Sequence, residues 1–310
     1  MEKETQELTL GIVFVVIVAS LIYLAPLPES PTNTINLGSS HSAEATVPQN
    51  GVGVVLPAVW GDLGTRLVET GAIDEAKFSA LYKNHGQFTD EYRKLLVGNN
   101  NGKLTVNEEN SGYLLNLLWA LGLANKNPIL EDKMEMMNPA YGGAGNFAST
   151  GGWTVAKGNA MNHYGKHALI ELTPEQQQLV DRVSRGIFRP CCGNSAHFPD
   201  CNHGMAMLGL LELMASQGVG EKEMYKTALA VNSYWFPDTY QTIEAYMRSK
   251  GILWKDVSPK EMLSTNYSSN AGYARIESLV QNPPASSGSG GCGVDSGARV
   301  APRQKSGCGI

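Results

Sequence analysis

The sequence predicts an all-α fold, in which a helical globular domain at residues 51–282 follows an N-terminal transmembrane helix and precedes a disordered Cys/Gly-rich tail. Three observations lead to this prediction. Helix-capping signals stand before apolar segments, as at residues 173–176. These segments have helical lengths and end at Gly or Pro. The domain also lacks a series of segments in which polar and apolar residues alternate, the pattern typical of half-buried strands.

The composition excludes some classes of protein. The chain has 310 residues, a net charge of −5 and 17% charged residues, and its Lys and Arg residues form no cluster. Nucleic acids require a basic surface, so we expect no nucleic acid partner. The length is sufficient for one or two domains with a substantial core.

Residues 8–27 are twenty consecutive residues without a charge, long enough to cross a bilayer as a helix. A signal peptide is the alternative, but the acidic residues at 1–7 and the lack of an A-x-A cleavage site favour an uncleaved anchor. Lys3 precedes the segment, and the next basic residue is Arg66. By the positive-inside rule, residues 1–7 are cytoplasmic, and the remainder of this single-pass cell-membrane protein is extracytoplasmic.

The linker and the first part of the domain are interpreted from composition and caps. Residues 28–50 are rich in Pro, Ser, Thr and Asn, which is typical of a flexible linker. Asp74 predicts a helix to about residue 84, and Thr89 predicts a second helix that closes at Gly98. Residues 97–108 match a calcium loop at several positions, but a valine stands where the first carboxylate ligand is required. The alternative is a turn followed by a capping box, which predicts a helix over residues 106–124.

Two groups of side chains before residue 170 are potential metal ligands. Met134, Met136 and Met137 are either thioether ligands for Cu(I) or packing residues, and we favour packing because methionine clusters are common in cores. His163 and His167 are four residues apart, which places them on one face if the segment is helical. Either at least one of them ligates a metal, or one is structural and the other lies at the surface. The segment lacks the Glu of the H-E-x-x-H motif, which argues against a metalloprotease.

Residues 190–204 concentrate the reactive side chains of the chain. They hold three of the five cysteines and two of the six histidines, namely Cys191, Cys192, Cys201, His197 and His203. Prolines and glycines constrain the segment, which connects a helix over about 174–185 with a buried helix over about 205–216. Asp200 or Asn202 is the expected N-cap, which places Cys201 and His203 at a helix N-terminus, where a thiolate is favoured. Thiols and imidazoles on such a loop suit a soft metal ion or thiol exchange.

The C-terminal part continues with helices and ends in the tail. Helices are predicted over residues 221–235 and 238–249, followed by a short last helix that opens at Ser258. From residue 283 the composition is typical of a disordered segment. A unit of Ser-Gly, Cys, Gly and an aliphatic residue occurs twice in it, around Cys292 and Cys308. These cysteines are either mobile thiol donors or part of a low-complexity tail without a role.

Residues 185–230 resemble bacterial extracytoplasmic PCYCGC-motif proteins. The similarity lies in the order of Pro-Cys, His, Asp-Cys and His, followed by a helix, a Gly and a second helix; it is carried by Pro190, Cys191, His197, Asp200, Cys201, His203 and residues 210–229. The resemblance implies an exported, membrane-attached protein with a Cys/His site. Two features differ from the motif: Cys191 and Cys192 are adjacent where the motif has spaced cysteines, and no later Cys-x-x-Cys follows.

Three functions are consistent with these residues. The first is a membrane-anchored extracytoplasmic protein that binds copper or zinc through a Cys/His cluster, with Cys292 and Cys308 exchanging the metal ion. Its candidate ligands are Cys191, Cys192, Cys201, His203, His197, His163 and His167. The second is an enzyme, a thiol–disulfide oxidoreductase that uses Cys201, Cys191 and Cys192 on another extracytoplasmic thiol protein. The third is a non-catalytic binding or structural protein whose loop is closed by a disulfide.

Overall fold

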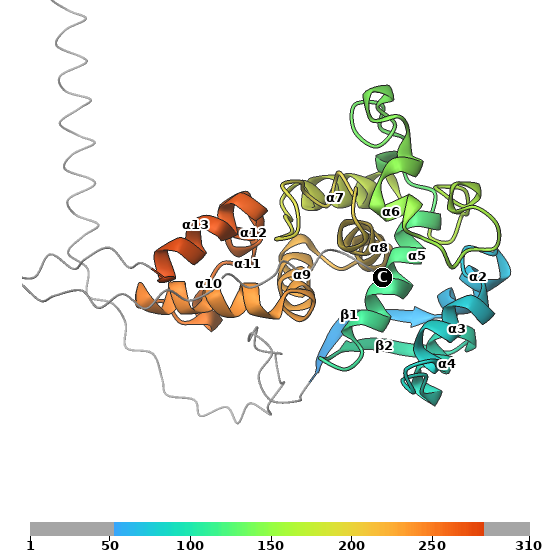
Figure 1. The fold of residues 1–310 in the computed structure, drawn as a ribbon, viewed down its shortest axis with the longest axis horizontal. Coiled ribbons are helices and arrows are strands. Elements are labelled where there is room, and N and C mark those ends of the chain that lie inside the picture. Colours follow the sequence, from blue (N-terminus) through green and yellow to red (C-terminus); the bar gives the residue numbers. More distant parts are fainter. Residues whose placement is uncertain (1–52, 282–310) are drawn as a thin grey trace, which may run out of the picture. The chain divides into compact units, whose positions relative to one another are not determined.

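The structure is a computed structural model that describes residues 53–281 (Figure 1). This part of the chain is predominantly helical, as predicted, and it also contains a sheet of two strands. The predicted anchor at residues 8–27, the linker at 28–50 and the tail from 283 onward lie outside the described residues. Among residues 53–281, no helix combines the length and the apolar character that a membrane span requires.

The described chain begins with the sheet and three short helices. β1 (Val54–Gly61) pairs with β2 (Asn101–Val106) in an antiparallel register. Between the two strands lie α2 (Leu63–Glu69), α3 (Glu75–Lys83) and α4 (Asp90–Val97). The caps of α3 and α4 are the predicted ones, since the side chains of Asp74 and Thr89 accept hydrogen bonds from backbone N–H groups three residues later.

The strand at residues 101–106 corrects the sequence analysis, which predicted a turn and then a helix from residue 106. α5 (Ser111–Ala124) begins five residues later than expected. The side chain of Asn101 donates hydrogen bonds to three backbone carbonyl groups and thereby holds the start of β2. The side chains of Asn107 and Asn110 each accept a hydrogen bond from the backbone N–H of the other residue. This mutual turn occupies the place of the predicted capping box.

The centre of the core is the contact between α5 and α8 (Asn202–Ser216), with α7 (Pro174–Arg185) and α9 (Glu221–Trp235) packed against α8. Figure 1 shows α8 nearly end-on among these helices. Nearly all side chains of α5 and α8 are buried, so both helices are apolar around most of their circumference.

α5 and α8 cross at a pair of glycines. A Cβ atom on Gly122 would overlap the backbone carbonyl of Met205, and one on Gly209 would overlap that of Leu118. Each glycine therefore lies directly against the backbone of the other helix. Any larger residue at either position would force the two helices apart.

Short helical turns form the segment between α5 and α7. They are η1 (Pro128–Glu131), η2 (Pro139–Tyr141), η3 (Ala144–Asn146), α6 (Ala148–Gly151) and η4 (Ala160–Asn162). Of the three clustered methionines, Met136 is buried, whereas Met134 and Met137 are 79% and 41% exposed. Packing in the core therefore accounts for Met136 and not for the other two.

The C-terminal helices follow the predicted order. α9 is succeeded by α10 (Pro237–Ser249), η5 (Trp254–Asp256) and α11 (Pro259–Met262), and the side chain of Ser258 caps α11 as expected. Two more helices follow, α12 (Thr265–Ser268) and α13 (Asn270–Gln281), so the helix that opens at Ser258 is not the last one.

The substitution Gly209→Ala should lower the free energy of unfolding by about 1–3 kcal/mol, because the added methyl group has to push α5 and α8 apart. Gly112→Ala in the exposed first turn of α5 is the matched control. A Cβ atom there meets no atom within 4 Å, so the better helix propensity of alanine should stabilise the protein by up to about 1 kcal/mol. Urea unfolding of the full-length protein measures both changes. Equal effects of the two substitutions would contradict the close crossing.

Glu212 is a buried acid in the middle of α8. One of its carboxyl oxygens accepts a hydrogen bond from the Asn127 side chain at 2.6 Å, and the other has no partner among the described residues. Burial raises the pKa of Glu212 from an ordinary 4.5 to about 8. Between these two values the folded protein binds one more proton than the unfolded chain, so its stability decreases as the pH rises.

The wild-type protein should lose on the order of several kcal/mol of unfolding free energy between pH 5 and pH 8 relative to Glu212→Gln. Glutamine keeps the shape and one oxygen acceptor of the protonated acid but does not ionise. The measurement is urea unfolding of both proteins across this pH range. If the difference between them does not change with pH, Glu212 does not carry the proton in the folded state.

Candidate metal centre

The loop that precedes α8 is fixed at both ends by backbone hydrogen bonds. The N–H of Phe188 donates to the carbonyl of Leu263, and the N–H of Ala196 donates to that of Ile187. In the middle of the loop, the carbonyl oxygen of Cys192 accepts a hydrogen bond from the N–H of Asn270 at 3.0 Å. Elements from α7 to the start of α13 therefore position the reactive residues.

The N-cap of α8 is Cys201, which corrects the prediction of Asp200 or Asn202. The sulfur of Cys201 accepts a hydrogen bond from the backbone N–H of Gly204 at 3.4 Å. The Asp200 carboxylate is bound instead by side chains of the loop, and the Asn202 side chain accepts from the N–H of the next residue. The cysteine itself thus occupies the position at the positive end of the helix dipole.

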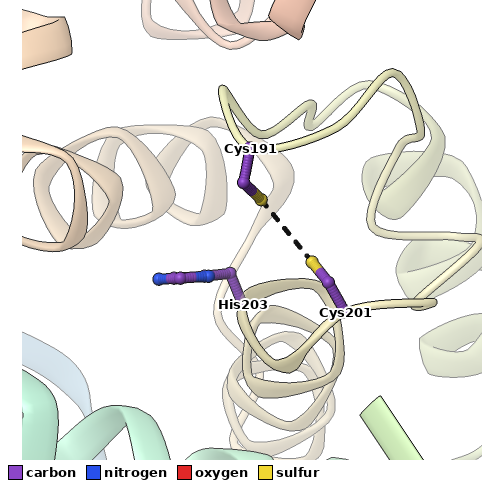
Figure 2. A group of neighbouring side chains, drawn as sticks. All are labelled: Cys191, Cys201 and His203. Carbon is purple, nitrogen blue, oxygen red and sulfur yellow. Dashed lines mark hydrogen bonds between the residues drawn. The ribbon is translucent and has the colours of Figure 1, made fainter. Parts of the chain in front are cut away.

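Cys201 lies between two sets of potential ligand atoms. Its sulfur is 3.7 Å from the sulfur of Cys191, and one ring nitrogen of His203 is within 4.8 Å of both (Figure 2). The sulfur of Cys192 and a carboxylate oxygen of Asp200 are also within 4.8 Å of the Cys201 sulfur. Cys201 therefore belongs to both sets of potential ligands. All three cysteines are partly buried.

Figure 2 shows Cys191 pointing down from the loop and Cys201 pointing up from the end of α8, with their sulfurs facing each other. The ring of His203 extends to the side and packs on Phe236, with ring centroids 4.4 Å apart. The Nδ1 atom of His203 is buried and has no hydrogen-bond partner in the described part of the chain. Leaving such an atom without a partner costs about 1–3 kcal/mol, which a ligand at this position would offset.

Arg189 is a site residue that the sequence analysis missed. Its side chain is 0% exposed, and its Nη2 atom donates to Asp200 at 2.7 Å and to the carbonyl of Phe198 at 3.3 Å. The other two guanidinium nitrogens, Nε and Nη1, have no partner within residues 53–281. The guanidinium lies against Gly204, where a Cβ atom would be 2.7 Å from Cζ. A buried cation with unused donors favours negative charge on the neighbouring sulfurs.

The thiols differ in acidity. The pKa of Cys201 lies well below the ordinary thiol value, chiefly because Cys191 and then Cys192 donate hydrogen bonds to its sulfur, and the charge of Arg189 acts in the same direction. The pKa of Cys191 is raised, since its hydrogen bonds with Cys192 and Cys201 favour the protonated form. Cys201 is thus the first of the three to become a thiolate, the form that binds metals and attacks disulfides.

His197 does not join the cysteines. It is 2% exposed, and both of its ring nitrogens are engaged: Nδ1 with the carboxylate of Glu135 at 2.7 Å and Nε2 with that of Asp181 at 2.8 Å. The imidazole thereby connects the segment after η1 to α7. Asp132, Glu135 and His197 place three ligand atoms within 4.8 Å of one another, but the two carboxylate contacts already satisfy the ring.

His163 and His167 form a pair elsewhere. The segment after η4 is not helical: His163 lies in a turn, and His167 forms an isolated β-bridge with Asn125. The turn still brings them together, with Nδ1 of His163 at 3.0 Å from Nε2 of His167 and Nε2 of His163 at 2.9 Å from the Lys157 carbonyl. Burial and the neighbouring His163 lower the pKa of His167. Within the described ranges, neither histidine belongs to a cluster of three or more potential metal ligands.

Comparisons with known proteins identify no relative. The chain matches no protein-family model, no curated protein and no solved structure. The resemblance to PCYCGC-motif proteins therefore stays a prediction based on residues 185–230. The tail thiols Cys292 and Cys308 lie outside the described residues.

Replacing Arg189 by Met should lower the unfolding free energy by about 3 kcal/mol, because the partly buried Asp200 carboxylate loses its counter-charge. The double variant Arg189→Met, Asp200→Asn should regain part of this loss, since the unpaired charge is removed. Arg248→Met is the control, because the Arg248 side chain is 65% exposed and its ion pair with Glu244 one helical turn away contributes about 0–1 kcal/mol. Urea unfolding of the wild type and the three variants measures these differences in unfolding free energy. No recovery in the double variant would show that Asp200 is not the group that Arg189 neutralises.

Proposed function

We propose that this protein is a membrane-anchored extracytoplasmic protein that binds one soft metal ion, copper or zinc, through Cys191, Cys201 and His203. The observation that carries the proposal is that one donor atom each of Cys191, Cys201 and His203 lies within 4.8 Å of the other two, and that the buried Nδ1 atom of His203 has no hydrogen-bond partner in the described chain. Two thiolates and an imidazole are the donors that Zn(II) and Cu(I) prefer, whereas Mg²⁺ and Ca²⁺ prefer oxygen ligands.

The distance between the sulfurs supports metal binding. In a tetrahedral zinc site with Zn–S bonds of about 2.3 Å, two sulfur ligands lie about 3.8 Å apart. The sulfurs of Cys191 and Cys201 are 3.7 Å apart, so an ion can bind between them without a change in the backbone. The ring of His203 is directed away from the two sulfurs in Figure 2, so it has to reorient to bring one nitrogen to the ion and complete a three-ligand site.

The charges around the donors also support the proposal. Metal binding converts Cys191 and Cys201 to thiolates, and the buried guanidinium of Arg189 is the cation that faces them. The Asp200 carboxylate already binds Arg189 and Asn194, which makes it a partner of the surrounding residues more than a metal ligand. These residues balance the charge of the site and hold the loop that carries Cys191.

A second candidate function is thiol–disulfide exchange, favoured by the facing sulfurs of Cys191 and Cys201. The Cys201 thiolate would attack a disulfide of another extracytoplasmic protein, forming a mixed disulfide and releasing one partner thiolate. The Cys191 thiolate would then attack the Cys201 sulfur, forming a Cys191–Cys201 disulfide and releasing the second partner thiolate. Two electrons pass from the cysteine pair to the partner, which is thereby reduced.

The metal proposal predicts that the reduced full-length protein in detergent binds one Zn²⁺ or Cu⁺ per chain. Cys201→Ser should weaken binding by more than about 100-fold, since removing a ligand costs more than removing one of its outer partners. The double variant His163→Asn, His167→Asn is the control and should bind as the wild type does, because this pair is not part of the cluster. Equilibrium titration against a competing chelator measures the affinities.

Counting free thiols in the same samples separates the two functions. Free thiols in the purified protein, together with one metal ion per chain, support the metal-binding function. A Cys191–Cys201 disulfide that exchanges readily with added dithiol, without metal affinity in the reduced state, supports the second function and overturns the first. A Cys191–Cys201 disulfide that does not exchange contradicts both functions and indicates a disulfide with a structural role only.

A further inference from the structure

A third sulfur lies beside the cysteine pair of the proposed metal site. The sulfur of Cys192 is within 4.8 Å of the Cys201 sulfur, which faces the Cys191 sulfur at 3.7 Å. The thiol of Cys191 in turn interacts with the sulfurs of both other cysteines. The proposed function uses Cys191 and Cys201 as ligands and leaves Cys192 without a role.

Cys192 has a fixed backbone and a weakly held thiol. Its carbonyl oxygen accepts a hydrogen bond from the N–H of Asn270 at 3.0 Å, whereas its sulfur donates to the carbonyl of Asn194 over 3.9 Å. A thiol is a weak hydrogen-bond donor, so turning the Cys192 side chain toward the other two sulfurs costs little. The loop can therefore present three sulfurs to one ion while its backbone keeps its position.

The imidazole of His203 is not directed at these sulfurs. Figure 2 shows its ring extending to the side of α8, away from the facing sulfurs of Cys191 and Cys201. The ring packs on Phe236, with centroids 4.4 Å apart, and lies edge-on to Trp235. An ion that requires sulfur ligands alone can therefore bind here without a reorientation of His203.

The number of sulfurs suits trivalent arsenic, a soft ion that takes three thiolates in a pyramid and keeps a lone pair at the fourth position. Arsenic–sulfur bonds are similar in length to the zinc–sulfur bond of about 2.3 Å, so pyramidal arsenic holds its sulfurs about 3.3–3.5 Å apart. The separation of 3.7 Å between Cys191 and Cys201 is close to this value.

The charge of the site also suits a trivalent ion. Three thiolates and As(III) form a neutral group, whereas the same three thiolates around Zn(II) or Cu(I) keep a negative charge. Burying a charge without a counter-charge is unfavourable, and the nearby cation Arg189 is already paired with Asp200 at 2.7 Å. The neutral arsenic group leaves this ion pair intact.

We propose that the protein binds trivalent arsenic through the sulfurs of Cys191, Cys192 and Cys201. The ion arrives as arsenous acid, As(OH)₃. Three As–S bonds form as three As–O bonds break, and each thiol proton leaves with a hydroxide as water. Arsenic stays trivalent, so the step needs no oxidant or reductant. The inference goes beyond the proposed function, since it shares two cysteines with that site but does not require His203.

The test is titration of the reduced full-length protein in detergent with sodium arsenite, in a phosphine reductant that contains no thiol. Saturating arsenite should lower the number of reactive thiols per chain from five to two, because three become bound to arsenic. Cys192→Ser should weaken arsenite binding by more than about 100-fold, since one of the three ligands is lost. His203→Asn should keep the arsenite affinity of the wild type while it weakens Zn²⁺ binding.

The double variant Cys292→Ser, Cys308→Ser is the matched control and should bind arsenite as the wild type does, with its three remaining thiols protected. All variants should unfold at the wild-type urea concentration, which shows that the fold is intact. If Cys192→Ser binds arsenite as tightly as the wild type, or if the control variant loses the binding, the three-sulfur site is wrong.

The remaining outcomes separate the inference from the proposed function. A wild-type protein that binds Zn²⁺ or Cu⁺ but no arsenite overturns the inference and leaves the proposed function standing. Loss of arsenite binding in His203→Asn also overturns the inference, because the imidazole is then required. If arsenite binds through the three cysteines while Zn²⁺ and Cu⁺ do not bind, the inference holds and the proposed function fails.

Discussion

The contact between α5 and α8 is the constraint on which the rest of the structure depends. Gly122 and Gly209 allow the two backbones to meet, and the apolar residues around them are removed from water on all sides. α8 is thereby held in the centre of the protein, between α5, α7 and α9. Its first turn carries Cys201 and His203, so these two side chains project from one of the most firmly packed elements. A site with two of its groups on a rigid helix keeps its geometry better than one built on loops alone.

Arg189 connects this helix to the loop. Its guanidinium contacts Gly204 of α8, the carbonyl of Phe198 and the carboxylate of Asp200, so a single buried side chain fixes three points of the segment. Removing a guanidinium from water is unfavourable unless acceptors and opposite charge surround it. The Cys201 sulfur, with its lowered pKa, provides part of that charge. The electrostatics of the site and the conformation of the loop therefore have a common cause.

Features that depend on residues close together in the sequence, such as helix caps, could be predicted, whereas features that depend on distant residues, such as strand pairing, could not. The caps at Asp74, Thr89 and Thr173 were predicted correctly because a cap depends on residues three positions apart. β2 was missed because its pairing partners lie forty or more residues earlier, and the side chain of Asn101 at the start of β2 donates to carbonyl groups of β1 and α4.

The candidate site was predicted in part for the same reason. The proximity of Cys191, Cys192, Cys201 and His203 in the sequence is reflected in their proximity in space. His197 lies between them in the sequence, yet it points toward carboxylates of two other segments, which no spacing indicates. Arg189 could not be recognised because an arginine is usually exposed, and its complete burial is a property of the tertiary structure.

The hydrogen bonds that hold the loop have a consequence for the order in which the protein is completed during synthesis. The candidate ligands lie at residues 191–203, but the loop is tied to Leu263 and Asn270, which the ribosome adds dozens of residues later. Until then Phe188 and the carbonyl of Cys192 lack their partners, and Cys191 is not held opposite Cys201. The cysteines therefore leave the ribosome well before the scaffold that positions them. During that interval the backbone contacts that position Cys191 opposite Cys201 are incomplete.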